Sequence, residues 1–301
     1  MQRILLFCLM LLFVQTTSAQ ITFCSGKSYP AISFSAETKT KLDADIENAR
    51  TVYLKDTSNS DALIWYGRRM AYIGKYEEAI SIYTKGIEMH PNDARLYRHR
   101  GHRYLTKRCI NKAIADFEKA ASLIKGKADE IEPDGMPNAQ NIPTSTLQSN
   151  IWYHLGLAYY LKADFKNAEN AYKECLKVST NPDMYVATAK WYYITLRALK
   201  KEKEAEALLQ TISKDMNLIE NEGYLTILLL YKQQQNPEEL YNSIFSNSNT
   251  LSNTTLGFGL GNYYRLNGQK EKAKAIFEKI TAGNQWGSFA YMAAEAMLLA
   301  P

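Results

Sequence analysis

The stretch from Ser60 to Leu123 decides the fold, because it contains one pattern twice. Residues 60–89 read SDALIWYGRRMAYIGKYEEAISIYTKGIEM, and residues 94–123 read ARLYRHRGHRYLTKRCINKAIADFEKAASL. Three residues of the first copy recur 34 positions later: Gly67 as Gly101, Ala79 as Ala113 and Tyr83 as Phe117. A repeat of this length predicts an array of stacked units, and the apolar spacing inside each copy predicts two amphipathic helices with a tight break between them.

Further copies follow along the chain. Residues 149–178 carry Gly156, Ala168 and Tyr172 at the same positions. A late copy, residues 254–283, carries Gly261, Ala273 and Phe277. Two weaker copies lie between them, one with Ala189, Leu196, Ala205 and Leu209, the other with Leu225, Ile227, Leu230 and Leu240. The pattern resembles the tetratricopeptide repeat (TPR) over roughly residues 60–283.

The resemblance implies an all-α fold, a TPR-type α-solenoid of helix-turn-helix pairs with one irregular insert and a C-terminal capping helix. In such a fold the small residues let paired helices approach closely, and the aromatic residue fills the remaining gap. The residues expected to pack the repeats are Gly67, Ala79, Tyr83, Gly101, Ala113, Phe117, Gly156, Ala168, Tyr172, Gly261, Ala273 and Phe277. Each pair would bury its apolar face on the next pair along the chain.

We expect six segments: 1–19 a signal peptide, 20–59 an extended leader and N-terminal capping helix, 60–124 the first two repeats, 125–148 the insert, 149–283 further TPR-like repeats, and 284–301 a C-terminal capping helix. The insert contains Pro133, Pro137 and Pro143, which cannot continue a helix, and it adds 21 residues beyond the 34-residue register. A connection of this length is expected to be a binding element or a mobile loop.

The N-terminus reads as an export signal. Arg3 precedes an apolar run from Ile4 to Val14, and Ala19 supplies a small residue before the expected cut. The run is too short for a permanent membrane span, so we expect an exported protein in the periplasm, in the cell envelope or secreted. Lipid attachment at Cys24 is the less favoured alternative, because bulky Phe23 stands where lipidation signals prefer a small residue.

Three cysteines remain after such a cut: Cys24, Cys109 and Cys175. An odd number allows at most one internal disulfide. Cys175 takes the small, buried position of Ala120, and Cys109 sits in the turn between two helices. We therefore interpret Cys109 and Cys175 as packing residues rather than as redox or metal-binding residues.

The strongest local signal is a basic run, because residues 94–115 contain several Arg, Lys and His and no acid. In TPR proteins the first helix of each pair lines the inner curve, so this run and its equivalents in neighbouring repeats would form a basic, aromatic-edged groove. The expected groove residues are Arg68, Arg95, Arg98, His99, His102, Tyr153 and His154. Such a groove suits a carboxylate or phosphate. The alternative is that the run is simply a solvated face.

Arg100 stands where other repeats have an apolar residue, and a buried guanidinium needs an acceptor. The insert offers four acids: Asp129, Glu130, Glu132 and Asp134. We therefore expect the insert to fold back over the inner curve, where its acids pair with Arg98, Arg100 or Arg103 and partly fill the basic groove.

These observations predict a non-catalytic protein–protein interaction scaffold that binds an extended peptide or an acidic segment along its concave groove. No catalytic residue, metal site or cofactor is expected, and a net charge of +5 is too small to favour nucleic acid. The alternative is a small-ligand or metal-binding protein, with possible hydrolytic activity, built on His99, His102 and His154. A third hypothesis is a structural part of an envelope complex.

Overall fold

The computed structural model describes residues 20–246 and 250–299. The expected signal peptide, residues 1–19, lies outside them. The described part contains one β-hairpin and fourteen α-helices: β1 (Gln20–Thr22), β2 (Ser28–Pro30), α1 (Ala36–Lys55), α2 (Ser60–Tyr72), α3 (Tyr76–Met89), α4 (Ala94–Thr106), α5 (Ile110–Ile124), α6 (Leu147–Leu161), α7 (Phe165–Val178), α8 (Pro182–Ala198), α9 (Glu202–Gln210), α10 (Glu222–Tyr231), α11 (Pro237–Phe245), α12 (Leu251–Leu266), α13 (Lys270–Thr281) and α14 (Phe289–Leu299). The predicted all-α solenoid is confirmed. None of the described helices is long and apolar enough to cross a membrane.

The four well-matched repeats are the helix pairs α2/α3, α4/α5, α6/α7 and α12/α13, and each uses the predicted contact between glycine and an aromatic ring. A Cβ placed on Gly67 would lie 2.4 Å from the ring of Tyr83, and one on Gly261 would lie 2.4 Å from Phe277. Gly101 with Phe117 and Gly156 with Tyr172 repeat the arrangement at 3.1 and 2.6 Å. Because a Cβ cannot be accommodated at these distances, the repeat needs glycine wherever the two helices cross.

Helix starts follow from the local sequence. The side chains of Asn59, Asp93, Thr146 and Asn181 accept hydrogen bonds from backbone N–H groups in the first turns of α2, α4, α6 and α8. The weaker copy that carries Leu225 and Leu240 contains α10, in which Leu225 and Ile227 to Tyr231 are buried. These caps and apolar faces place the helices close to their predicted bounds.

The N-terminal segment differs from the extended leader that the sequence predicts. Residues 20–30 form an antiparallel hairpin with Ile21 opposite Tyr29, and a disulfide joins Cys24 to Cys109, 85 residues away. The interpretation of Cys109 as a simple packing residue is therefore wrong. Cys175, by contrast, is a buried free thiol, as expected of a packing residue.

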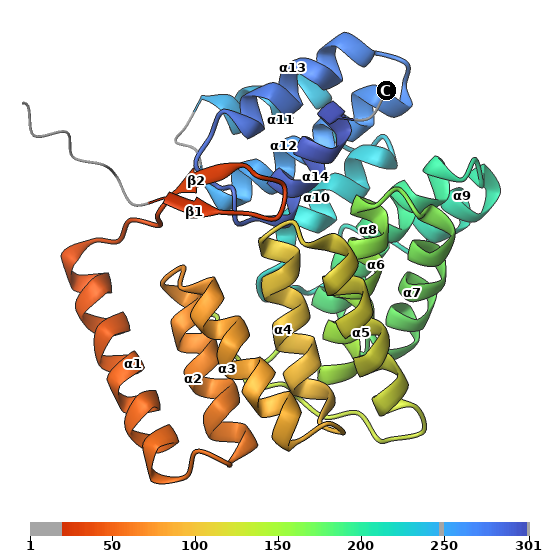
Figure 1. Ribbon diagram of the computed structural model, residues 1–301. Helices are drawn as coiled ribbons and strands as arrows, with labels where there is room; N and C mark the ends of the chain where they lie inside the picture. The colour runs from red at the N-terminus through yellow and green to blue at the C-terminus, as the bar shows by residue number, and fades with distance from the viewer. Residues whose placement is uncertain (1–19, 247–249, 300–301) are drawn as a thin grey trace, which may run out of the picture.

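The C-terminal helices return towards the beginning of the solenoid. Figure 1 shows α1 to α9 following one another in a curved row, while the helices α10 to α14 lie on one side of that row, above α4, α6 and α8 and beside the hairpin. Contacts support this closure, since α14 packs on α12 and α13 and also reaches α6. The ring of Trp286, just before α14, lies 5.4 Å from Phe23 and 6.2 Å from Tyr76, measured between ring centroids. The concave side is thus enclosed by the chain itself.

Candidate functional site

The insert covers the inner face of the first three repeats. The carbonyl of Gly135 accepts a hydrogen bond of 3.0 Å from Nη1 of Arg69 in α2. A Cβ on Gly135 would lie 2.0 Å from the hydroxyl of Tyr72, so any other residue here would have to displace the ends of the α2 side chains that contact the insert. An isolated bridge between Ile131 and Thr146 closes the base of the insert in front of α6.

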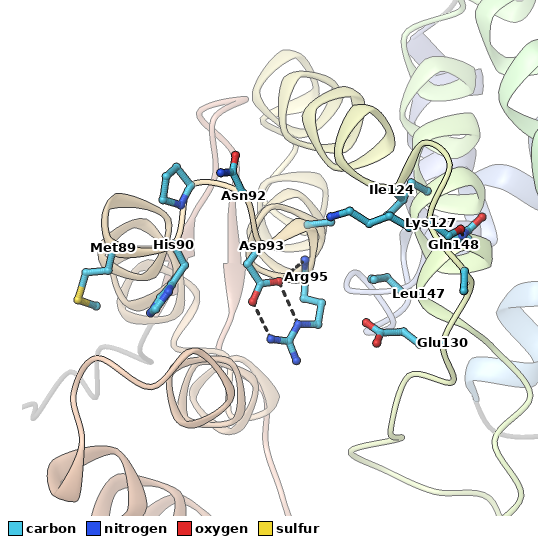
Figure 2. A pocket seen from close by; sticks show the side chains of 13 residues that line it. Met89, His90, Asn92, Asp93, Arg95, Ile124, Lys127, Glu130, Leu147 and Gln148 are labelled. Atoms are coloured by element: carbon cyan, nitrogen blue, oxygen red, sulfur yellow. Dashed lines mark hydrogen bonds and ion pairs between the residues drawn. The ribbon is translucent and has the colours of Figure 1, made fainter.

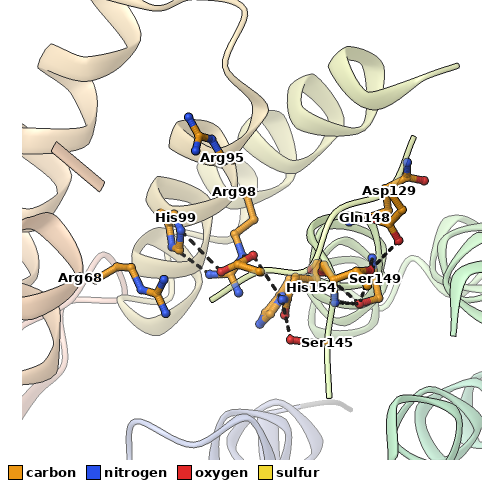
Figure 3. A network of polar contacts seen from close by, with 12 residues as sticks. Arg68, Arg95, Arg98, His99, Asp129, Ser145, Gln148, Ser149 and His154 are labelled. Carbon is orange, nitrogen blue, oxygen red and sulfur yellow. Dashed lines mark hydrogen bonds and ion pairs between the residues drawn. The ribbon is translucent and has the colours of Figure 1, made fainter. Parts of the chain in front are cut away.

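The predicted pairing of the insert with the basic run is found at Glu132. Its carboxylate lies 3.0 Å from Nε of Arg98 and 3.5 Å from Nε2 of His99, and it accepts a hydrogen bond of 3.2 Å from the amide of Asn150. All three ionisable side chains are buried. Figure 3 shows these groups together, with Arg68 on one side and Ser149 and His154 on the other. Glu132 therefore occupies the place that a ligand carboxylate would take.

Arg98 also orients His99. Nη1 of Arg98 lies 3.0 Å from Nδ1 of His99, and arginine can only donate, so Nδ1 accepts and Nε2–H faces Glu132. Burial, followed by the nearby Arg98 charge, holds the pKa of His99 well below its usual range. His99 is therefore a neutral side chain that lies against both members of the Arg98–Glu132 ion pair.

Arg100 corrects the sequence prediction, because its partner is not in the insert. Its guanidinium forms two hydrogen bonds, of 2.9 and 2.8 Å, to the carboxylate of Asp116 in α5 and a third, of 3.1 Å, to Thr84. Arg100 and Asp116 both depart from the repeat pattern, since Tyr66 and Ile82 stand 34 residues earlier. The two substitutions compensate each other inside one repeat.

Arg95 lies away from the other basic residues, at a surface cavity of about 700 Å³ formed by the turn before α4 and the start of the insert. Figure 2 shows it folded against Asp93, with which it makes hydrogen bonds of 2.9 and 2.6 Å. Nη1 of Arg95 also lies 2.6 Å from Asp61. Both anionic partners come from the protein, so the positive charge is already neutralised.

Arg68 is buried, and its guanidinium lies 4.3 Å from the centre of the Trp65 ring, a cation–π distance. Of the seven expected groove residues, five are buried: Arg68, Arg98, His99, Tyr153 and His154. The structure thus brings most of them to one face but covers that face with the insert, and direct contact of these seven residues with a peptide stays a prediction.

The remaining histidines meet the C-terminal helix. The rings of His102 and His154 lie 4.6 Å apart, and that of Phe289, the first residue of α14, lies 5.4 and 5.3 Å from them. Burial lowers the pKa of His154 to about 3, and burial also holds the pKa of His102 well below its usual range. Both rings are therefore neutral at physiological pH. No group of three or more potential metal ligands occurs among residues 20–246 and 250–299.

What remains open on the concave side is a cavity of about 960 Å³, here called the chamber. It lies between the segment after the hairpin, α2, α3, α4, the insert, α8, α10, α12 and the segment leading into α14. Its walls are largely aromatic: Tyr72, Tyr76, Trp191, Tyr224, Trp286 and Phe289. This volume and lining are typical of a ligand pocket.

The edge of the chamber carries exposed apolar side chains from three distant segments. Ile32 follows the hairpin, Met136 belongs to the insert, and Leu251 begins α12; all three line the chamber, with exposures of 36, 66 and 58%. Single exposed apolar residues are ordinary, but three around one opening form a patch that favours a partner.

Two cationic side chains line the chamber without an ion pair to any carboxylate in the described residues, Arg103 of α4 and Lys190 of α8. The guanidinium of Arg103 lies 5.8 Å from the centre of the Tyr76 ring. The one acid of the lining, Glu220, is exposed and accepts a hydrogen bond from the hydroxyl of Thr144. Arg103 and Lys190 are therefore the two groups of the lining that are available to pair with an anion.

A clasp closes one side of the chamber, and it consists of the Cys24–Cys109 disulfide and the contacts of Glu295. The carboxylate of Glu295 forms ion pairs with Arg108 at 2.7 Å and with Lys27 at 3.4 Å. It also accepts a hydrogen bond from the hydroxyl of Tyr29. Arg108 also donates a hydrogen bond of 2.7 Å to the backbone carbonyl of Trp286. Arg108 has a φ of +60°, at the position that Gly74 fills one repeat earlier with a φ of +81°. The chain accepts a strained arginine there, where its side chain joins the two ends of the solenoid.

Comparison with known proteins agrees with this architecture. Residues 149–182 and 258–282 match the family model of the tetratricopeptide repeat. The first region spans α6 and α7, and the second covers the end of α12 and all of α13. The chain thus carries tetratricopeptide repeats within an all-α solenoid, a class of protein that serves mainly as interaction scaffolds.

The chain is also similar to several solved structures at low sequence identity. A tetratricopeptide repeat protein from Parabacteroides merdae is 17% identical, with 85% of this chain and 94% of that chain covered and a TM-score of 0.49. PilF from Pseudomonas aeruginosa is 14% identical, with coverages of 87 and 92% and a TM-score of 0.47. YrrB, described as a TPR protein with an unusual peptide-binding site, is 16% identical, with coverages of 83 and 97% and a TM-score of 0.45. No curated protein matches the chain.

The sequence reasoning missed the chamber, the clasp and Lys190. Arg108 and Glu295 carried no signal because 187 residues separate them. Lys190 did carry one, since it interrupts the otherwise apolar surroundings of Trp191 on a helix that is buried on nearly every side. A cation in such a stretch is a reason to look for a site.

Proposed function

We propose that the protein is a non-catalytic interaction scaffold that binds a short segment of a partner protein in the chamber, rather than a long peptide along an open groove. The observation that carries the proposal is the aromatic chamber of about 960 Å³ with its apolar edge of Ile32, Met136 and Leu251. Aromatic walls bind apolar side chains strongly because they bury a large area with little loss of conformational entropy.

The insert explains why the chamber is favoured over the basic groove. Glu132 already neutralises Arg98, and the insert covers the first helices of three repeats. A peptide would have to displace this buried ion pair to reach the groove residues, whereas the chamber is open to it. In this proposal the insert shapes the binding surface, and Met136 presents its apolar end to the partner.

The proposal is tested by selecting binders from a library of displayed peptides and measuring the affinity of one selected peptide for variants. Met136→Glu and Leu251→Glu place charges at the edge of the chamber and should weaken binding by about tenfold or more. Val52→Glu is the matched control, because Val52 is 55% exposed on α1 and does not line the chamber. Equal affinities for all three variants, or a library that yields no binder, would refute chamber binding.

We also propose that the protein is exported. The pattern of residues 1–19 is typical of a signal peptide, and the Cys24–Cys109 disulfide adds support because disulfides persist in oxidising compartments and are rare in the cytosol. Cell fractionation combined with thiol labelling of Cys24 and Cys109 tests this. Recovery of a reduced, full-length chain in the cytosol would contradict it.

A further inference from the structure

Lys190 is the most unusual ionisable group on the wall of the chamber. The side chain lies on α8 and has no solvent exposure. Among the described residues its amine has no hydrogen-bond partner. Buried lysines are rare and are normally paired, because an unpaired amine loses its hydration without compensation. This chain retains one in the lining of the chamber.

The surroundings of the amine favour a positive charge but supply no counter-ion. Nζ lies 3.5 Å from the centre of the Trp191 ring and 4.5 Å from that of Phe258, and the Tyr224 ring is 5.9 Å away. The faces of these rings carry negative potential, which stabilises an ammonium group. What the site lacks is an anion.

A ligand that enters the chamber can bring that anion close to the amine. Arg103 lines the same space without an ion pair in the described part of the chain, whereas Glu220, the acid of the lining, is already hydrogen bonded to Thr144. A carboxylate that reaches the Lys190 amine would supply the counter-ion that the described residues do not, between aromatic rings where an ion pair is stronger than in water.

We propose that the segment bound in the chamber carries a carboxylate, from an acidic side chain or a free C-terminus, and that this carboxylate forms an ion pair with the amine of Lys190. This inference rests on the proposed function, because it assigns the ligand chemistry of the same chamber. The amine is fully covered, so the carboxylate reaches it when the half-buried ring of Tyr224 turns aside. The hydroxyl of that ring lies 3.3 Å from the hydroxyl of Tyr153.

Binding would then take up a proton. Burial alone holds the pKa of Lys190 well below its usual range, so the empty site holds a neutral amine more readily than an exposed lysine does. The titratable groups that face it from neighbouring helices are Tyr224 of α10 and, behind it, Tyr153 of α6; burial raises the pKa of both, so both stay neutral. An arriving carboxylate favours the ammonium form, and affinity should therefore fall as pH rises.

The experiment uses phenylacetate as the probe and phenylacetamide as its uncharged isostere, with the full exported chain. Isothermal titration is run in buffers of different ionisation enthalpy, so that proton uptake is measured directly. We expect wild type to bind phenylacetate about tenfold more tightly than phenylacetamide, with uptake approaching about one proton per ligand, and the preference to shrink between about pH 6 and about pH 9.

Lys190→Met should abolish both the preference and the proton uptake. Lys214→Met is the matched control, because Lys214 is exposed and lies outside the chamber, and it should behave as wild type. Tyr224→Ala should speed phenylacetate binding by opening the route. Circular dichroism confirms that each variant is folded.

Three results would overturn the inference: a Lys190→Met variant that keeps the preference, binding without proton uptake, or a wild type that binds neither probe at about 20 mM. None of these three results affects the peptide selection, which tests the proposed function separately. A selection that yields chamber-binding peptides independent of Lys190 would therefore reject the carboxylate anchor and retain the scaffold.

Discussion

The disulfide of the clasp gives the most direct test of the closed architecture. Changing both Cys24 and Cys109 to Ser removes the covalent link between the hairpin and the turn before α5. The bond closes a loop of 85 residues, and for a loop of that length the restriction of the unfolded chain is worth about 4–5 kcal/mol. For a chain of this size, this loss corresponds to a fall in melting temperature of about 10–15 °C.

The loss of stability should be greatest in the hairpin and in the C-terminal helix that packs beside it. A repeat array unfolds in segments, so the hairpin and α14 should open before the central repeats. The Glu295–Arg108 pair remains in the double variant and should still hold the two ends together in part. We therefore expect hydrogen exchange to increase in residues 20–30 and 289–299 and to change little in α6 and α7.

The assay combines differential scanning calorimetry with hydrogen exchange followed by mass spectrometry. A reductant supplies the internal control: it should lower the melting temperature of wild type and leave the double variant unchanged. If the double variant melts at the wild-type temperature, or if its exchange rises uniformly along the chain, then the disulfide does not stabilise the docking of the hairpin on the turn before α5, and the reasoning fails.

Three further predictions concern single positions. Glu132→Ala leaves a buried guanidinium without its carboxylate and should cost about 3–5 kcal/mol in urea unfolding, whereas exposed Asp134→Ala should stay within about 0.5 kcal/mol; equal effects would contradict the ion-pair account. Gly67→Ala forces a methyl group to within 2.4 Å of an aromatic ring and should cost about 1–3 kcal/mol, while Gly223→Ala, whose nearest neighbouring atom is 3.9 Å away, should be neutral or slightly stabilising; the two melting temperatures decide between these outcomes. Lys190→Met removes an unsatisfied buried amine and should stabilise the protein by about 1–3 kcal/mol at neutral pH. Because burial depresses the pKa of Lys190, the unfolded wild type binds more protons than the folded protein up to about pH 10, so the gain should be largest at low pH and shrink as pH rises; a gain independent of pH would refute this.

The repeat packing could be predicted because it is local. Gly101 and Phe117 are 16 residues apart in one helix pair, and their contact recurs in every well-matched repeat. The fold of the insert onto the basic run could also be predicted, since an acidic segment and an unpaired cluster of arginines attract each other. Which acid meets which arginine could not: Glu132 pairs with Arg98, while Arg100 takes Asp116. That choice depends on side-chain directions that spacing alone does not give.

The sequence by itself determined the helix pairs, their order and the direction in which they stack, because these follow from apolar periodicity, caps and close helix crossings within about 34 residues. Only the tertiary structure decided that the solenoid closes on itself. Closure depends on small rotations that accumulate from repeat to repeat, and it brings Phe23 against Trp286 and Arg108 against Glu295. The chamber results from that closure, which is why no local pattern indicated it.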